Sequence, residues 1–225
     1  MRVSVVIPTL EEAMALPGTL DHLAQLPGEL EVVVADGASS DGTPQVAARH
    51  PRTDAVVEVP RGGGRARQLN AGASRATGDV LLFLHADSRL PQGAFATLAS
   101  TRADGGNFAL RFDGADRFSR VLTRVYALQR RFGLYYGDSS IWVRRPVFER
   151  LGGFRELPIM DDYDFVRRLE RSVATACLPG PATTSARRWR GHGVACTVSS
   201  WLIIRWLFIA GAPPVRLARL YRLVR

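Results

Sequence analysis

Lysine is absent from the 225-residue chain: all 30 basic side chains are arginine, against 21 Asp and Glu, for a formal charge of +9. Cysteine is nearly absent too, because Cys177 and Cys196 are the only two and form no C-x-x-C spacing. Neither a disulfide framework nor a thiolate zinc site is therefore indicated. The opening segment MRVSVVIPTL is interrupted by Pro8 and is too short for a signal peptide, so we expect a cytoplasmic protein.

Two common phosphate-binding fingerprints are missing. No G-x-G-x-x-G opens the first expected helix, and G-x-x-x-x-G-K-[ST] does not occur. The nearest glycine-rich segment, RGGGRAR at residues 61–67, lacks the lysine that a P-loop requires. The sequence therefore argues against a dinucleotide-binding or kinase-like function.

Acidic residues are missing from the C-terminal quarter, since none follows Glu170 whereas nine arginines do. Residues 1–170 hold the other 21 arginines (30 minus 9) and all 21 acids, so the excess charge lies in the tail. Nucleic acid and an anionic membrane are the two partners that such a tail suits.

No apolar run in the tail is long enough to span a bilayer, because Arg205 and hydroxyl residues interrupt VACTVSSWLIIRWLFIAGA. The last segment, PPVRLARLYRLVR, alternates arginine with leucine at helical spacing, and Trp201 and Trp206 precede it. These features favour a helix lying in an anionic membrane interface, and we expect no nucleic acid partner. The alternative is a C-terminal helix packed on the core.

Four apolar runs alternate with helical segments in the first 90 residues: RVSVVI, LEVVVAD, DAVVEVP and DVLLFLHAD. Such alternation predicts an α/β fold with a mainly parallel sheet covered on both faces. Before the second helix, TPQVAARH, a Ser or Asp cap is expected, and a glycine-rich loop should precede a helix near residues 67–76. Further on, GGNFALRFD, VATACLP and PATTSARRW are expected as strands, and ADRFSRVLTRVYALQRRF and MDDYDFVRRLERS as helices.

Asp36 and Asp87 each follow one of these runs, and ligands of open α/β sheets bind outside the carboxyl ends of the strands. A lone carboxylate holds a hard cation weakly, but a diphosphate would supply the missing oxygens. Arg65 and Arg67, on the glycine-rich loop, suit the same phosphates through forked hydrogen bonds. Turn residues and solvated loop charges are the alternatives at these positions.

Four segments, in order, resemble the family-2 glycosyltransferases, which have the GT-A fold. They are SVVIPTLEEA, VVVADGASSDGT for the family's DDGSxDGT, GRARQLNAGASRATGDVLLFLHADS ending in its DxD, and GGF…MDDYDFVRRL for its acidic ED helix. The resemblance covers residues 2–190. It implies a GT-A (nucleotide-diphospho-sugar transferase) domain at residues 1–190 and a C-terminal helical tail at residues 191–225.

The resemblance also implies a set of residues that bind the nucleotide sugar: Pro8, Thr9, Glu11, Asp36, Arg65, Arg67, Asp87, Arg188 and Trp189. The family's first DDG aspartate is Ala35 here, which leaves Asp36 to contact the base. The DxD is reduced to its last carboxylate, so Asp87 is the expected ligand of Mn²⁺ or Mg²⁺. His85 and His192 are candidate further ligands; a strand-end or surface histidine is the alternative.

Asp161 and Asp162 occupy the place of the family's acidic pair. An inverting transfer needs one base for the acceptor hydroxyl, and position assigns it to Asp162, with Asp161 as its neighbour. Acids also favour any helix N-terminus, and Asp164 would fit that explanation equally well. The segment SARRWRGHG resembles the QxxRW of polymerising synthases with Ser185 in place of Gln, so a processive polymerase is not expected.

The expected function is therefore a metal-assisted inverting transfer from a nucleotide-diphosphate sugar to a hydroxyl acceptor. Arg188 would contact the diphosphate and Trp189 the acceptor. A lipid-linked acceptor would suit an enzyme bound peripherally to the inner face of the plasma membrane. Two alternatives stay open: a GT-A-like nucleotidyltransferase, and a non-catalytic module that binds a nucleotide sugar or a lipid.

Overall fold

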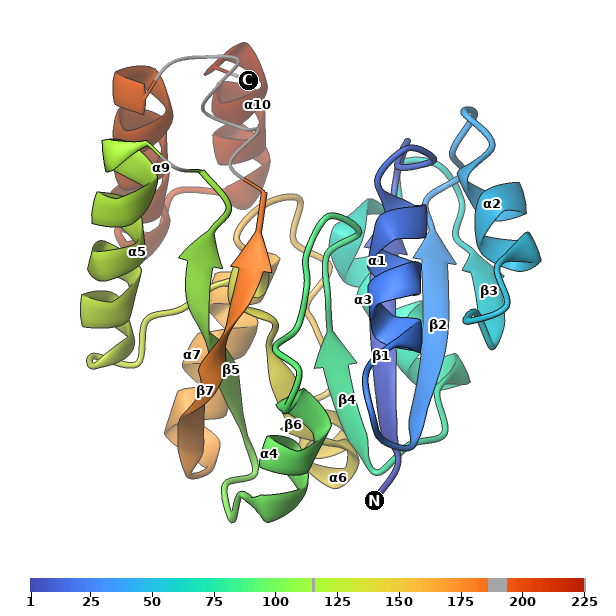
Figure 1. Cartoon of the computed structure of the whole chain (residues 1–225). Helices are drawn as coiled ribbons and strands as arrows, with labels where there is room; N and C mark the ends of the chain where they lie inside the picture. The colour runs from blue at the N-terminus through green and yellow to red at the C-terminus, as the bar shows by residue number, and fades with distance from the viewer. Residues whose placement is uncertain (115, 186–193, 225) are drawn as a thin grey trace.

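Four parallel strands form the N-terminal half of the sheet (Figure 1). The protein is represented by a computed structural model that describes residues 1–114, 116–185 and 194–224. The strands, in spatial order, are β3 (Ala55–Glu58), β2 (Leu30–Asp36), β1 (Val3–Thr9) and β4 (Val80–Phe83). The connecting helices are α1 (Leu16–Ala24), α2 (Thr43–Arg49) and α3 (Gly64–Arg75). The predicted α/β alternation is confirmed.

Pro8 lies inside β1, although the sequence suggested that it would end the strand. The Val6 carbonyl accepts a hydrogen bond from the Leu84 N–H, on the side of β1 that faces β4. Because Pro8 is two residues further along the strand, its backbone nitrogen points to that same side. The β4 pairing ends at Val6, so nothing there requires an N–H from Pro8.

Side chains of each buried strand pack on both faces of the sheet. Val5 contributes to the core under α1 and α4 (Ala94–Ser100), whereas its neighbour Val6 packs beneath α3. The second core also contains the apolar faces of α6 (Arg145–Arg150) and α7 (Asp161–Ser172). Burial on both sides explains why these strands are continuous apolar runs.

The second half of the sheet is mixed. Next to β4 lies β6 (Trp142–Arg144), which pairs antiparallel with both β4 and β5 (Gly105–Phe112). The outermost strand, β7 (Thr175–Thr184), is parallel to β5. Helix α5 (Arg117–Arg130) and the 3-10 turn η1 (Gly137–Ser139) connect β5 to β6.

Three local expectations were wrong. Residues 175–184, which span most of VATACLP and the start of PATTSARRW, form one strand, because a register shift opposite Phe108–Leu110 accommodates its two prolines. Helix α3 begins at Gly64, so Arg65 and Arg67 lie in its first turns rather than in a loop. The residue before α2 is Gly42, whose φ of 89° favours glycine, instead of a Ser or Asp cap.

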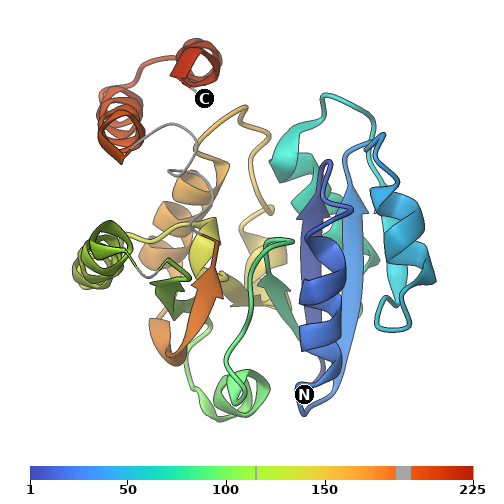
Figure 2. The same ribbon diagram turned by 45° about the horizontal axis from the view of Figure 1, so that its top comes forward.

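Two helices form the tail: α9 (Val194–Ile209) and α10 (Pro214–Val224). Figure 2 shows them at the same end of the molecule as α5. Trp201 of α9 packs against the cluster that contains Phe118, Leu122 and Tyr126 of α5, and Leu217 of α10 is buried. Within the described ranges, no helix combines the length and apolar character needed to cross a membrane.

Candidate active site

The carboxyl ends of β1 and β2 are joined by buried hydrogen bonds. Asp36, the last residue of β2, is fully buried and accepts from the Thr9 hydroxyl (2.8 Å), the Ser39 hydroxyl (2.7 Å) and the Ser39 N–H (2.8 Å). Gln68 of α3 donates its amide to the carbonyls of Thr9 (2.6 Å) and Ala35 (3.1 Å). The two strand ends and the loop after β2 are therefore held in a fixed arrangement.

Glu11 lies in the loop after β1, with a positive φ of 57°. Its N–H donates to the Ser39 hydroxyl (2.9 Å), and its carboxylate accepts from the N–H (2.9 Å) and hydroxyl (3.0 Å) of Ser40. Glu11 thus fastens the loop after β1 to the loop after β2.

His85 and Asp87 follow β4 in a turn, and both side chains are half-buried. The turn is anchored on two sides: the Ala86 carbonyl accepts from the Thr19 hydroxyl (2.6 Å), and the Ser88 hydroxyl donates to Thr184 of β7 (2.9 Å). Asp87 and Asp36 both lie at the carboxyl ends of the parallel strands, since β2 and β4 both run parallel to β1.

A divalent cation would find one carboxylate and one imidazole in this turn. Among the residues that the structure describes, no three His, Cys, Asp or Glu side chains gather to form a metal site. Such a donor set fits Mn²⁺ or Mg²⁺ only together with the oxygens of a diphosphate. Arg188, Trp189 and His192 lie outside the described residues.

Arg65 ties the start of α3 to the start of α7. Its guanidinium donates to both carboxylate oxygens of Asp161 (2.7 and 3.1 Å), and Nη2 lies 3.1 Å from Asp162 Oδ2. Both acids are almost buried, with side-chain exposures of 6% and 13%. The sequence suggested that Arg65 grips phosphates; in the structure its nearest anions are these two carboxylates.

The ionisation of Asp162 reflects opposing effects. Burial raises its pKa, but the charge of Arg65 and the N–H groups of Gly137 (2.9 Å) and Tyr163 (2.8 Å) outweigh burial, so the pKa lies below its usual range. The same two carboxylates raise the pKa of Arg65 against the effect of its burial. At neutral pH Asp162 and Arg65 are therefore both charged.

Gly137 of η1 lies where three polar side chains converge. A Cβ atom built there would lie 3.2 Å from His85 Nε2, 3.3 Å from Asp162 Oδ2 and 3.4 Å from Arg65 Nη1. These groups line a small cavity of about 10 Å³, together with Pro8, Gly137, Leu69, Phe83, Ile141 and Phe154. The structure therefore brings together Pro8, Arg65, His85 and Asp162, which are distant in the sequence.

Asp164 and Arg67 lie apart from this cavity's lining. Asp164 accepts from Arg155 (3.0 Å) and Arg168 (2.8 Å). Arg67 donates to Glu156 (2.8 and 3.3 Å) on an exposed surface, and this contact raises the pKa of Arg67. Of the three acids at the start of α7, only Asp161 and Asp162 contact Arg65.

Aromatic side chains connect the acidic pair to α9. Tyr136, which precedes η1, stacks on Tyr163 at a centroid distance of 6.2 Å. The Arg205 guanidinium of α9 donates to the Tyr136 hydroxyl (3.5 Å), and Phe208 meets Tyr163 edge-on at 5.9 Å. The tail helix therefore contacts the neighbours of Asp162.

The family model that matches is "Glycosyl transferase family 2", over residues 4–171. The chain belongs to glycosyl transferase family 2. A "PGL/p-HBAD biosynthesis glycosyltransferase" of Mycobacterium bovis (strain BCG / Pasteur 1173P2) is 38% identical over 182 residues, covering 72% of this chain and 67% of that protein. "Uncharacterized protein MT1568" of Mycobacterium tuberculosis (strain CDC 1551 / Oshkosh) is 30% identical, covering 79% and 64%.

Solved structures support the GT-A fold of this glycosyltransferase. S. aureus TarS 1–349 in complex with UDP-GlcNAc matches with a TM-score of 0.68 and 18% identity, over 84% of this chain but 59% of that one. The mannosyltransferase PcManGT from Pyrobaculum calidifontis, in complex with GDP-Man and Mn²⁺, matches with a TM-score of 0.67 and 22% identity, over 99% and 69%. The predicted fold, family and enzyme class are confirmed.

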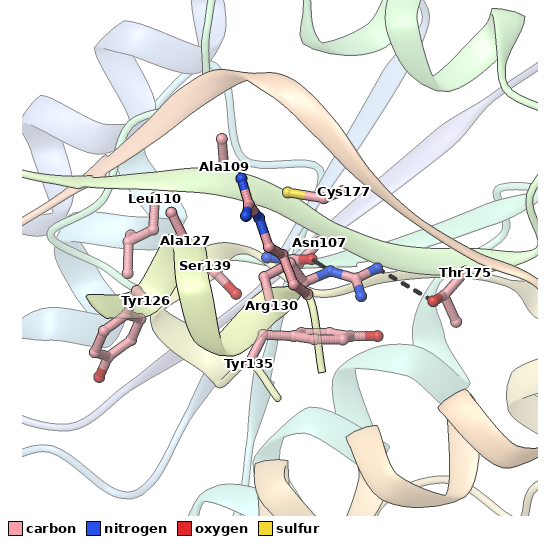
Figure 3. A pocket seen from close by; sticks show the side chains of 11 residues that line it. Asn107, Ala109, Leu110, Tyr126, Ala127, Arg130, Tyr135, Ser139, Thr175 and Cys177 are labelled. Atoms are coloured by element: carbon pink, nitrogen blue, oxygen red, sulfur yellow. Dashed lines mark hydrogen bonds between the residues drawn. The ribbon is translucent and has the colours of Figure 1, made fainter. Parts of the chain in front are cut away.

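A larger cavity of about 400 Å³ lies between α5 and strands β5 and β7 (Figure 3). The Arg130 side chain crosses this cavity and donates hydrogen bonds to Asn107 (2.6 Å) and Thr175 (3.1 Å). Its guanidinium lies 3.4 Å from the Glu170 carboxylate and 4.5 Å from the centre of the Tyr135 ring. Because these neighbours already satisfy its charge, we regard Arg130 as a structural tie between α5 and the sheet.

Sequence reasoning missed Gln68, Gly137 and Tyr136. The position of Gln68 one turn into α3 was no signal by itself, because its acceptors lie on two other elements. Gly137 precedes an ordinary Asp-Ser-Ser segment, and its importance depends on His85 and Asp162 meeting there. Only tertiary structure reveals these roles.

Proposed function

We propose that this glycosyltransferase inverts the anomeric centre of a nucleotide-diphosphate sugar, with a divalent cation, while transferring the sugar to a hydroxyl acceptor. The observation that carries the proposal is the meeting of Asp162 with His85 and Arg65 around Gly137, at the carboxyl edge of the parallel strands. Ligands of open α/β sheets bind at this edge. The bound nucleotide sugars named for TarS and PcManGT support a donor of this class.

Asp162 is the proposed base. Its carboxylate would accept the acceptor hydroxyl proton as that oxygen attacks the anomeric carbon and the bond from this carbon to the diphosphate oxygen breaks. Asp161, held by two hydrogen bonds to Arg65, would position that arginine. Asp164, held by Arg155 and Arg168, is the weaker candidate.

Asp87 and His85 would hold the cation, with His192 as a third candidate ligand. The cation would neutralise negative charge on the departing diphosphate. Arg65 would contact the same phosphates through Nη1, which faces Gly137. Contacts to the donor from Thr9, Glu11, Asp36, Arg67, Arg188 and Trp189 remain part of the proposal.

We further propose that the basic tail contacts an anionic membrane at the inner face of the plasma membrane, and that the acceptor is lipid-linked. Supporting this, α9 contacts Tyr136 and Tyr163 beside Asp162, and no acid follows Glu170. A lipid-borne hydroxyl would then reach the catalytic carboxylate from the side of the tail.

The test separates binding from chemistry. Nucleotides are first screened by thermal shift with and without Mn²⁺, because a specific ligand raises apparent stability. With the donor so found, Asp162→Asn should retain donor affinity but lower turnover by roughly two to four orders of magnitude. Asp161→Asn is the matched control and should lower turnover less. If Asp161→Asn is the more damaging change, Asp161 is the base.

A further inference from the structure

The exposed face of α5 is divided into two parallel rows of opposite character. The basic row consists of Arg117, Arg120, Arg124 and Arg131. The apolar row consists of Val121, Val125, Leu128 and Phe132. The last residue of each row lies just past the end of the helix. Residues of a helix advance by about 100° each, which places the apolar row roughly 80° around the axis from the basic row. Both rows therefore face solvent side by side.

The apolar row is unusually exposed for a folded domain. Val121, Leu128 and Phe132 expose 53%, 54% and 70% of their surface. The opposite side of α5 is already used, because Leu122 is buried in the cluster against which Trp201 packs. The exposed row is therefore not the core-facing side of an ordinary amphipathic helix, and it requires an explanation of its own.

The tail also exposes apolar side chains. Among the side chains of helix α9 that the structure describes, five large apolar ones are exposed: Leu202, Ile203, Trp206, Leu207 and Ile209. Figures 1 and 2 both show α5 and α9 at the end of the molecule remote from β3. Trp201 joins the two helices on their inner sides.

The charges on these helices identify the partner. The sequence contains no Asp or Glu from Arg117 to Phe132 or after Glu170, whereas the basic row supplies three arginines on α5 and a fourth just past its end. A second copy docking through this face would bring positive helices together with no acid on them to oppose the repulsion. An anionic lipid surface satisfies both rows, because arginines meet head groups while apolar side chains enter the interface.

We propose that the exposed faces of α5 and α9 form the surface by which this glycosyltransferase docks on an anionic bilayer. This inference deepens the proposed membrane contact, on which it rests, and moves its main surface from the last helix to α5 and α9. Asp162 would then lie close to the bilayer, since α9 touches Tyr136 and Tyr163.

The experiment is co-sedimentation of the full chain with phosphatidylcholine vesicles, with and without phosphatidylglycerol, at low and high salt. Arg120→Gln/Arg124→Gln should weaken binding to the anionic vesicles by roughly 25-fold at low salt, at about fivefold per arginine. Val125→Ser/Leu128→Ser should weaken binding at both salt concentrations. The matched control is Arg49→Gln/Arg75→Gln, on exposed positions of α2 and α3, which removes the same net charge.

The control should bind like the wild type. The proposal is overturned if the wild type does not bind the anionic vesicles, if the control weakens binding as much as the α5 pair, or if deletion of residues 213–225 abolishes binding that both α5 variants retain. Thermal melting and Mn²⁺-dependent nucleotide binding of each variant should match the wild type. If neither the wild type nor any variant binds a nucleotide, the proposed reaction is contradicted. The vesicle result would still show whether the faces of α5 and α9 bind the membrane.

Discussion

Replacing Arg65 by Gln would leave two nearly buried carboxylates without their counter-charge. Removing one member of a buried ion pair costs about 3–5 kcal/mol, because the remaining charge is uncompensated. Since 34% of the Arg65 side chain is exposed, water would screen part of this loss, and we expect about 2–3 kcal/mol at neutral pH. For a chain of this size, that loss lowers Tm by roughly 4–12 °C.

The loss should depend on pH with a definite sign. In the wild type the pKa of Asp162 is lowered, so its ionised form stabilises the fold above its usual value of 3.8 and this contribution disappears as pH falls. Without Arg65, burial prevails and the pKa of Asp162 should be raised, which destabilises the variant as pH increases. The Tm difference between the two proteins should therefore be smallest below pH 3.8 and widen toward neutrality.

Thermal unfolding of wild type and Arg65→Gln between pH 3.5 and 7 measures this difference. Carbon-13 NMR of the aspartate carboxyl groups, with Asp162→Asn for assignment, follows the titration directly. Arg67→Gln is the matched control: it lies two residues away on α3 but pairs with the exposed Glu156. A Tm difference for Arg65→Gln that is independent of pH, or equal to that of Arg67→Gln, would refute the reasoning.

Two further predictions concern Asp87 and Glu31. Asp87→Ala should abolish the Mn²⁺ dependence of nucleotide binding in a thermal-shift titration, and a metal response equal to that of the wild type would show that the cation lies elsewhere. Burial raises the pKa of Glu31, but hydrogen bonds from Ser4 and Thr77 outweigh burial and lower it overall. Glu31→Gln should lower the free energy of unfolding by about 1–3 kcal/mol at pH 7. The difference in Tm between wild type and variant should narrow as the pH falls below 4.5, the usual pKa of Glu, because wild-type Glu31 then becomes protonated. A Tm difference that does not change with pH would contradict this.

The sequence predicted the sheet well because local pattern and burial agree there. The runs that became β1, β2 and β4 are buried on both faces, so their apolar continuity follows directly from the fold. The length of β7 could not be predicted, because its two prolines suggest a break and only the pairing with β5 accommodates them.

The places of the candidate residues in the fold were predicted, but the contacts between them were not. Motif order correctly put Asp36 at the end of β2 and Asp162 at the start of α7. The partner of Arg65 was missed, since Asp161 is 96 residues away and no spacing rule connects α3 to α7. The hydrogen bonds that occupy Asp36 likewise depend on the neighbouring end of β1, where Thr9 lies.

Trp201 lies outside the residues that match the family model, whereas the α5 residues of the same apolar cluster lie inside them. That match stops at residue 171, yet Trp201 lies beyond it and packs against the cluster of Leu110, Phe112 and Leu122 inside it. A fragment ending at residue 190 would expose these side chains to water. Related enzymes that carry a different tail should therefore also differ on the inner side of α5, so that the two segments are inherited as a pair.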